Sequence, residues 1–432
     1  MQFILRLASY SSVFLGYLLF MSVYAPLGIN WMDFHADRIV NAVEFLNLNG
    51  RDTFGFTIWS VCNDCVLESS WSEGITSHHA IVFWPYLIMY FIGGIESVLV
   101  AGPIFDKCLI FLCAVLIAEL MIKFSKNYSH LPNILLGIVC FSLFALSPWT
   151  YKMFLGGWWE AYFLMFFLFG ILSFENKNLK LGLASFFMAA MMHFLWAFVL
   201  LIFYVLLTIS PLFIKNETSS VNRFFPPNTL IPSNRSSVML SLSLPIIGLI
   251  LIQLIASFYI DFATNSSVFY RMGISGNDAH NGGLIGALQF LAGSRFTQCF
   301  GGQGIEFFSG NSLVLIGIYN CLFSLIGMTA LSLISITGIY FLIKNSQLAL
   351  KTLLPLIFCL LFFITVFQQS LSVHLMGYSF IFSALFASGM THVMLMVQRR
   401  ISSPILGFIF AIPCISGILL LSIRVSMLSG MS

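Results

Sequence analysis

Three ionisable residues alternate along one short stretch near the start of the chain: Asp33, His35 and Asp37. They follow closely on the first long apolar stretch, so a membrane crossing by that stretch places them near the lipid headgroups. Asp33 and Asp37 share one face if this stretch is helical. A carboxylate held there can act as a general base toward a hydroxyl group. The alternative interpretation is a pair of ordinary solvated carboxylates, with Asp37 at the start of a helix.

A further acid, Glu160, follows Trp158 and Trp159 at the point where an apolar stretch resumes. A carboxylate at interfacial depth is costly unless it is paired or functional. We therefore expect Glu160 to contribute to a site. The alternative is an aromatic belt whose glutamate reaches back to water.

A third polar segment, 261–311, contains Arg271, His280 and Arg295. Arginine binds phosphate through its bidentate fork, so these residues are candidates for holding a phosphate or pyrophosphate. The stretch 282–293 is a candidate short helix whose free amides would face the same anion. The alternative is an ordered, glycine-rich loop whose basic residues meet lipid headgroups.

One more histidine, His374, falls at the end of a later apolar stretch. It is a candidate for hydrogen bonding to a sugar or a phosphate. The alternative is a structural histidine at a helix end.

The chain has 9 cysteines, and most of them fall in apolar stretches, where a cysteine acts as a small hydrophobic residue. Cys62 and Cys65 are the exception, because they fall in a polar segment. We expect a short disulfide between them in an oxidising compartment, with Cys299 as a spare partner. A zinc site would need two more ligands, for which His78 and His79 are weak candidates.

The composition indicates that membrane-spanning helices position these candidate residues. The 432 residues are 59% hydrophobic and only 8% charged, which is too much apolar surface for a water-soluble core. Apolar stretches of about 20 residues recur along the chain, and the alternation of a membrane barrel is missing, so the spans must be helices. No Lys/Arg-rich run is present, which argues against a nucleic-acid partner. The first apolar stretch, 7–27, is expected to stay as an anchor rather than be cleaved as a signal peptide.

We expect an all-α polytopic membrane protein with about 11 transmembrane helices, in a range of roughly 10 to 13. Two stretches required a choice. The segment 81–101 is interpreted as interfacial or re-entrant, and the long apolar run 181–210 is divided at His193 into two short helices. The expected spans are 7–27, 104–123, 133–147, 160–174, 180–192, 194–211, 238–259, 312–343, 353–369, 376–397 and 404–424.

Charge gives these spans a direction. With a cytoplasmic N-terminus, 12 of the 19 Lys and Arg residues fall on the cytoplasmic side, as the positive-inside rule requires. Most of the 16 acidic residues fall at the outer side, which points to work at that face. The expected modules are 1–210, with the outer loop 28–103 and an interfacial amphipathic helix at 37–49; a cytoplasmic connector, 211–237; and 238–432, with the outer loop 260–311.

This arrangement resembles the GT-C class of integral membrane glycosyltransferases, which use polyprenyl-phosphate sugars. The resemblance covers roughly residues 1–210. In it, Asp33 and Asp37 match the acid of the long first outer loop, Glu160 matches the second outer acid, and 181–210 matches a broken pair of short helices. Many members carry two adjacent acids, whereas this chain has two residues of other kinds and His35 between Asp33 and Asp37.

The resemblance implies transfer of a sugar from a lipid-linked donor to an acceptor at the outer face. Asp33, with Asp37 second, would be the general base, and Arg271, Arg295 or His280 would stabilise the departing lipid phosphate. Mg²⁺ or Mn²⁺ is an optional cofactor, lipids and a lipid-linked sugar are the expected partners, and the plasma membrane of a bacterium is the expected location. The alternatives are a transporter or flippase of a lipid-linked sugar or other amphiphile, and a polysaccharide polymerase or ligase.

Overall fold

The structure of the protein is a computed structural model. It describes residues 2–24, 36, 39–40, 42–44, 47, 80–125, 132–147, 150, 159–213, 235–259, 329–362 and 374–401, and the statements below concern these residues.

The described part of the chain is helical and contains no strand, which confirms the all-α prediction. Three segments are long and apolar enough to cross a membrane: Gln2–Val23, Ile81–Phe124 and Phe380–Arg400. Six further apolar helical stretches have 10–17 residues each, counted over the residues whose side chains the structure describes. In chain order the elements are α1 (Gln2–Tyr24), the 3-10 helix η3 (Ala80–Phe83), α3 (Trp84–Phe124), α4 (Asn133–Ala145), α6 (Trp159–Glu175), α7 (Leu179–Met192), α8 (Phe194–Phe213), α10 (Arg235–Tyr259), the helix Thr329–Asn345, α15 (Gln347–Phe362) and α16 (His374–Ile401).

The predicted break at His193 is confirmed. Helix α7 ends at Met192 and α8 begins at Phe194, with His193 in an extended conformation between them. Joined end to end, α7 and α8 would measure about 50 Å, which is too long for one straight crossing of the bilayer. The hydropathy pattern alone was sufficient here, because an apolar run of this length must bend or break in a membrane about 30 Å thick.

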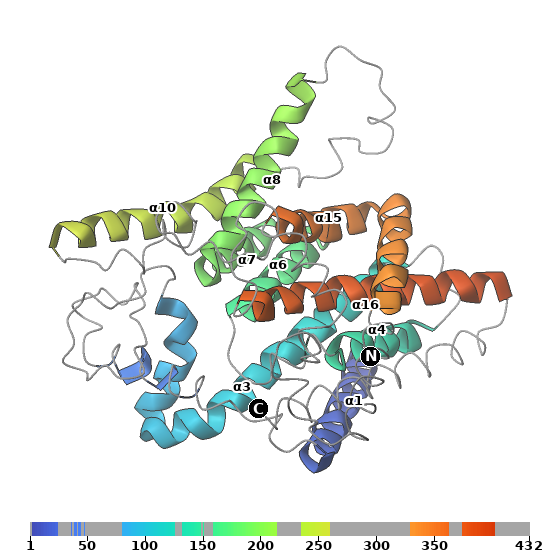
Figure 1. The fold of residues 1–432 in the computed structure, drawn as a ribbon, viewed down its shortest axis with the longest axis horizontal. Helices are drawn as coiled ribbons and strands as arrows, with labels where there is room; N and C mark the ends of the chain where they lie inside the picture. Colours follow the sequence, from blue (N-terminus) through green and yellow to red (C-terminus); the bar gives the residue numbers. More distant parts are fainter. Residues whose placement is uncertain are drawn as a thin grey trace, which may run out of the picture.

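Helix α3 differs from the prediction, which separated 81–101 from a span at 104–123. In the structure the 41 residues of α3 form two helical segments that meet at a kink, and the kink lies at Gly93 and Gly94, whose backbone is not helical (Figure 1). Gly94 has φ 67° and ψ −160°, a backbone conformation that is essentially restricted to glycine, so glycine is suited to the bend. Pro103 lies inside the helix and does not end it. A straight helix of this length would measure about 60 Å, twice the hydrocarbon core, and the bend resolves that mismatch.

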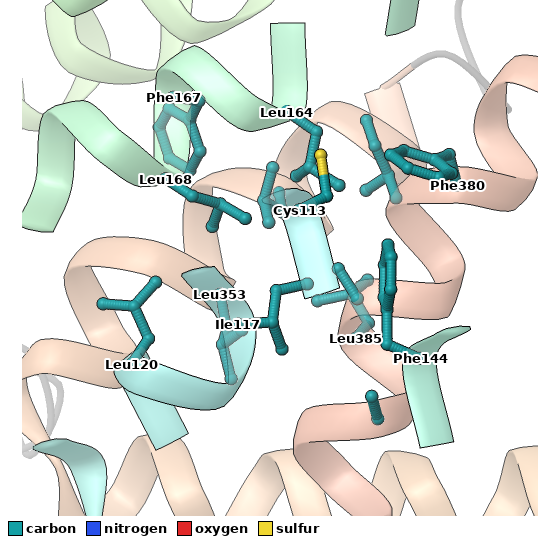
Figure 2. Packing of buried hydrophobic residues seen from close by; sticks show 14 of the residues in the cluster. Cys113, Ile117, Leu120, Phe144, Leu164, Phe167, Leu168, Leu353, Phe380 and Leu385 are labelled. Carbon is teal, nitrogen blue, oxygen red and sulfur yellow. The ribbon is translucent and has the colours of Figure 1, made fainter. Parts of the chain in front are cut away.

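Helix α16 lies at the centre of the bundle and α1 at its edge. In an apolar 18-residue stretch of each helix, 83% of the residues of α16 are buried inside the protein, against 17% for α1. Figure 2 shows the core beside α16, where Cys113 and Ile117 of α3 meet Leu164 of α6 and Leu385 of α16. Helices from both halves of the chain therefore share one hydrophobic core.

Glycines allow two helices to touch backbone to backbone. A Cβ atom at Gly338 would overlap the carbonyl oxygen of Gly389 in α16, and a Cβ atom at Gly389 would overlap the carbonyl oxygen of Ser335. The Ser335 hydroxyl also donates to the carbonyl oxygen of Phe386, at 3.1 Å. Small residues at such crossings are typical of membrane helices, where close packing replaces the hydrophobic effect.

The predicted amphipathic helix at 37–49 is helical at each described position, which are 39–40, 42–44 and 47. Its apolar face lies against protein. Ile39 and Val43 are buried in a second apolar cluster with Tyr86 of α3, Tyr162 of α6 and Met192 of α7. The sequence pattern predicted the helical face, but the partner is the bundle itself rather than a bare membrane surface.

Candidate functional site

Charged residues tie several helices together at one end of the bundle. Arg6 of α1 forms two bonds to Glu119 of α3, from Nε to Oε1 and from Nη2 to Oε2, both 2.7 Å long. The Tyr10 hydroxyl donates to the same Oε1 at 3.2 Å. The guanidinium fork and the carboxylate match in shape, so this pair fixes the orientation of α1 against α3.

Two further contacts belong to this end. Lys123, at the last turn of α3, donates to the side-chain oxygen of Asn176 at 2.7 Å. Lys351 of α15 pairs with Glu175 at the end of α6, at 3.1 Å. We call this end, with Arg6, Lys123 and Lys351, the basic end. All three were assigned to the same side of the membrane by the sequence pattern, so the predicted sidedness is self-consistent.

Glu160 lies at the other end of α6. It is the second residue of the helix, whereas Glu175 is the last. Its Oε1 lies 3.4 Å from Nε2 of His193, and the two side chains are 3% and 6% exposed. This end of α6 is called the acidic end. The structure thus places Glu160, the acid predicted for a site, beside His193, the residue that separates α7 from α8.

His193 is fixed from several directions. Its backbone is extended (φ −146°, ψ 93°), so α7 stops there. Its Nδ1 accepts the backbone N–H of Trp196 at 3.4 Å, which satisfies one of the free amides at the start of α8. The rings of Phe163 and Trp196 lie 6.5 and 6.1 Å from the imidazole, both nearly edge-on. The imidazole therefore has little freedom to turn.

The second oxygen of Glu160 has no hydrogen-bond partner among the described residues. Oε2 is fully buried, like the rest of the side chain. A buried carboxylate oxygen without a partner keeps the cost of leaving water, so each such atom calls for an explanation, and a functional site is one. Oε2 is the strongest indication in the described part of the chain that a ligand binds at the acidic end.

A second carboxylate, Asp106 of α3, is buried at the same end. The Tyr86 hydroxyl donates to its Oδ1. Tyr162 of α6 is close enough to interact with both groups, and its ring lies 6.1 Å from that of Phe105. Asp106 precedes Lys123 by about 25 Å of helix, which places it far from the basic end. The two buried acids, Asp106 and Glu160, thus lie on neighbouring helices and on the same side of the bundle.

Most of the residues predicted for the site lie outside the described residues, and those assignments stay predictions. Helix α16 begins at His374, as expected for a histidine at a helix end, but its side chain is also outside the described part. Glu160 is the predicted site residue that the structure places. The residues outside are Asp33, His35, Asp37, Cys62, Cys65, Arg271, His280 and Arg295.

No group of three or more His, Cys, Asp or Glu side chains in the described ranges is arranged to hold a metal ion.

Two residues of the acidic end were not singled out as functional from the sequence. His193 was used only to divide an apolar run, and Asp106 was counted only among the outer acids. Both carried a signal, because an ionisable residue within a long apolar stretch is a candidate for function by default. What the sequence lacked was the partner: nothing in the pattern joins His193 to Glu160 or Asp106 to Tyr86.

The chain was compared with protein-family models, with curated proteins and with solved structures, and no match was found in any of the three.

Proposed function

We propose that this protein is a multi-pass membrane glycosyltransferase of the GT-C type, with about 11 transmembrane helices. It transfers a sugar from a polyprenyl-phosphate donor to an acceptor hydroxyl at the outer face of the membrane. The observation that carries the proposal is the buried Glu160 carboxylate, which has one oxygen beside His193 and one oxygen without a hydrogen-bond partner among the described residues.

The placement of charge supports a site at the outer face. Arg6, Lys123 and Lys351 lie at the basic end, and positive residues in short loops favour the cytoplasm. The acidic end then faces outward, where Glu160 and Asp106 are the buried acids of the described residues. A lipid-linked sugar anchored in the outer leaflet presents its headgroup at this depth.

The reaction balances without further reagents. The acceptor oxygen forms a bond to the anomeric carbon of the sugar, and the bond between that carbon and the phosphate oxygen breaks. The acceptor proton passes to a carboxylate, for which Asp33 is the first candidate and Asp37 the second. The lipid phosphate leaves with its added negative charge, which Arg271, Arg295 or His280 stabilises. Glu160 binds the sugar or the acceptor beside them.

A transporter of a lipid-linked sugar is the main alternative. Transporters commonly place ionisable residues and broken helices near the middle of the membrane. Glu160 is instead the second residue of its helix, at the membrane interface that the proposed topology gives to this helix end. This position favours an interfacial active site over a transport path.

The test is a transfer assay with purified protein and a panel of polyprenyl-phosphate sugars. We expect Asp33→Asn and Glu160→Gln each to reduce kcat/KM by about 100-fold or more, because both remove a carboxylate from the site. Glu175→Gln is the matched control, since it makes the same change at the other end of α6 and should keep activity within about 3-fold.

Two results would contradict the proposal. One is full activity in Asp33→Asn, Asp37→Asn and Glu160→Gln. The other is movement of the lipid-linked sugar across vesicle membranes by a wild-type protein that transfers no sugar, which would establish the transporter.

A further inference from the structure

The arrangement around His193 separates two roles within one ring. Nδ1 faces the start of α8 and accepts the Trp196 N–H, at 3.4 Å. A nitrogen that accepts a hydrogen bond carries no proton, so Nε2 is the ring nitrogen that bears the N–H. Nε2 is the atom that lies 3.4 Å from Oε1 of Glu160. The start of α8 therefore selects the tautomer that turns an N–H toward the carboxylate.

This arrangement leaves Glu160 with a fixed direction and an unused acceptor. One oxygen is beside an N–H donor, the side chain is 3% exposed, and Phe163 packs against the imidazole. The other oxygen, Oε2, has no partner among the described residues and cannot reach bulk water. A carboxylate in this state accepts a hydrogen bond from a donor group that enters the site.

We propose that His193 is a positioning residue for Glu160, and that Glu160 Oε2 accepts a hydrogen bond from one hydroxyl group of the transferred sugar. The inference rests on the proposed glycosyl transfer and adds the residue pair that selects the sugar. Because a site built around a buried acceptor strongly rejects a ligand that lacks the donor, this pair determines specificity for that hydroxyl.

Two substitutions separate the roles of the ring. The amide of asparagine reaches about as far as Nδ1, so His193→Asn keeps an acceptor at the start of α8, where asparagine is a favoured cap. The amide of glutamine reaches about as far as Nε2, so His193→Gln keeps the N–H toward Glu160 and loses the cap. If His193 served only to cap α8, His193→Asn would preserve activity and stability better than His193→Gln.

The experiment measures KM and kcat for the best donor, together with the melting temperature, in wild type, His193→Asn and His193→Gln. We expect His193→Asn to raise the KM about 10-fold while kcat stays within about 3-fold. Without the N–H of His193, Glu160 is no longer held in place, and the hydrogen bond from the sugar hydroxyl to its carboxylate is weakened. We expect His193→Gln to keep the KM near the wild-type value and to lower the melting temperature by about 2–4 °C through the lost cap.

A series of donors that each lack one hydroxyl identifies the group that is bound. For one member of the series, wild type, His193→Asn and Glu160→Gln should have the same KM, because the contact is then missing in all three. Asp106 and its partner Tyr86 serve as a comparison, since Tyr86→Phe should not abolish this discrimination between donors.

The outcomes distinguish the two proposals. If the wild type transfers no sugar from any donor, the proposed function is overturned and this inference falls with it. If the wild type is active and His193→Asn keeps the wild-type KM, or if His193→Gln raises the KM as much as His193→Asn does, then only the positioning role is overturned. The same holds if no single hydroxyl of the donor removes the difference between the variants.

Discussion

Arg6 of α1 and Glu119 of α3 form a bidentate ion pair, although the two residues lie 113 positions apart in the chain. Both side chains are mostly buried, at 12% and 15% exposure. The pair thus differs from a solvent-exposed salt bridge, and its energetic consequences are measurable.

The first prediction concerns this pair. Arg6→Leu should lower the free energy of unfolding in detergent by about 2–3 kcal/mol, because it leaves the Glu119 carboxylate with Tyr10 as its hydrogen-bond donor. The double variant with Glu119→Leu should recover most of this loss, since two apolar side chains need no partner. Lys351→Ala is the control, because that pair is more exposed and should contribute less than about 1 kcal/mol. Equal losses in all three variants would contradict the interpretation.

The second prediction concerns the backbone contact between the helix Thr329–Asn345 and α16. Gly389→Ala should reduce stability by about 2–3 kcal/mol, because the added carbon overlaps the carbonyl oxygen of Ser335 and forces the helices apart. Gly248→Ala in α10 is the matched control, since no atom lies within 4 Å of the added carbon. It should be neutral or stabilising by up to about 1 kcal/mol. Thermal unfolding of the two variants measures the difference, and a tolerant Gly389 would argue against this helix contact.

The third prediction concerns the turn between α6 and α7. Lys177 has φ 60°, the one positive value among the described residues other than glycine. Lys177→Gly should therefore stabilise the protein by about 1 kcal/mol. Lys177→Ala removes the same charge but keeps the Cβ atom, so it should give no gain. A gain in both variants would assign the effect to charge instead of backbone strain.

The fourth prediction concerns sidedness. Single cysteines introduced at Asn228 and Ser275, in a background without native cysteines, should be labelled from opposite sides of the membrane. The reason is that α10 lies between the two positions in the chain. An impermeant maleimide on intact cells and on inverted vesicles makes the measurement. Labelling of both positions from one side would overturn the proposed topology.

Much of the helical framework could be predicted from the sequence. The break at His193 and the helix boundaries near 133, 160 and 180 agree with the structure within a few residues. These features are visible in one dimension, because a membrane forces each apolar stretch to satisfy its own backbone as a helix and ends it near a polar residue. The kink in α3 was harder to predict. Pro103 is the stronger local signal for a helix end, but the kink lies at Gly93 and Gly94.

The site shows the same division. The sequence by itself determined that the protein is helical and apolar enough for a membrane, and it marked Glu160 as an acid in a costly place. Only the tertiary structure decided that His193 is the neighbour of Glu160, that Asp106 is held by Tyr86, and that Arg6 is paired with Glu119. Hydropathy acts on each residue and its near neighbours along the chain, whereas these pairs depend on which helices pack together and at what height.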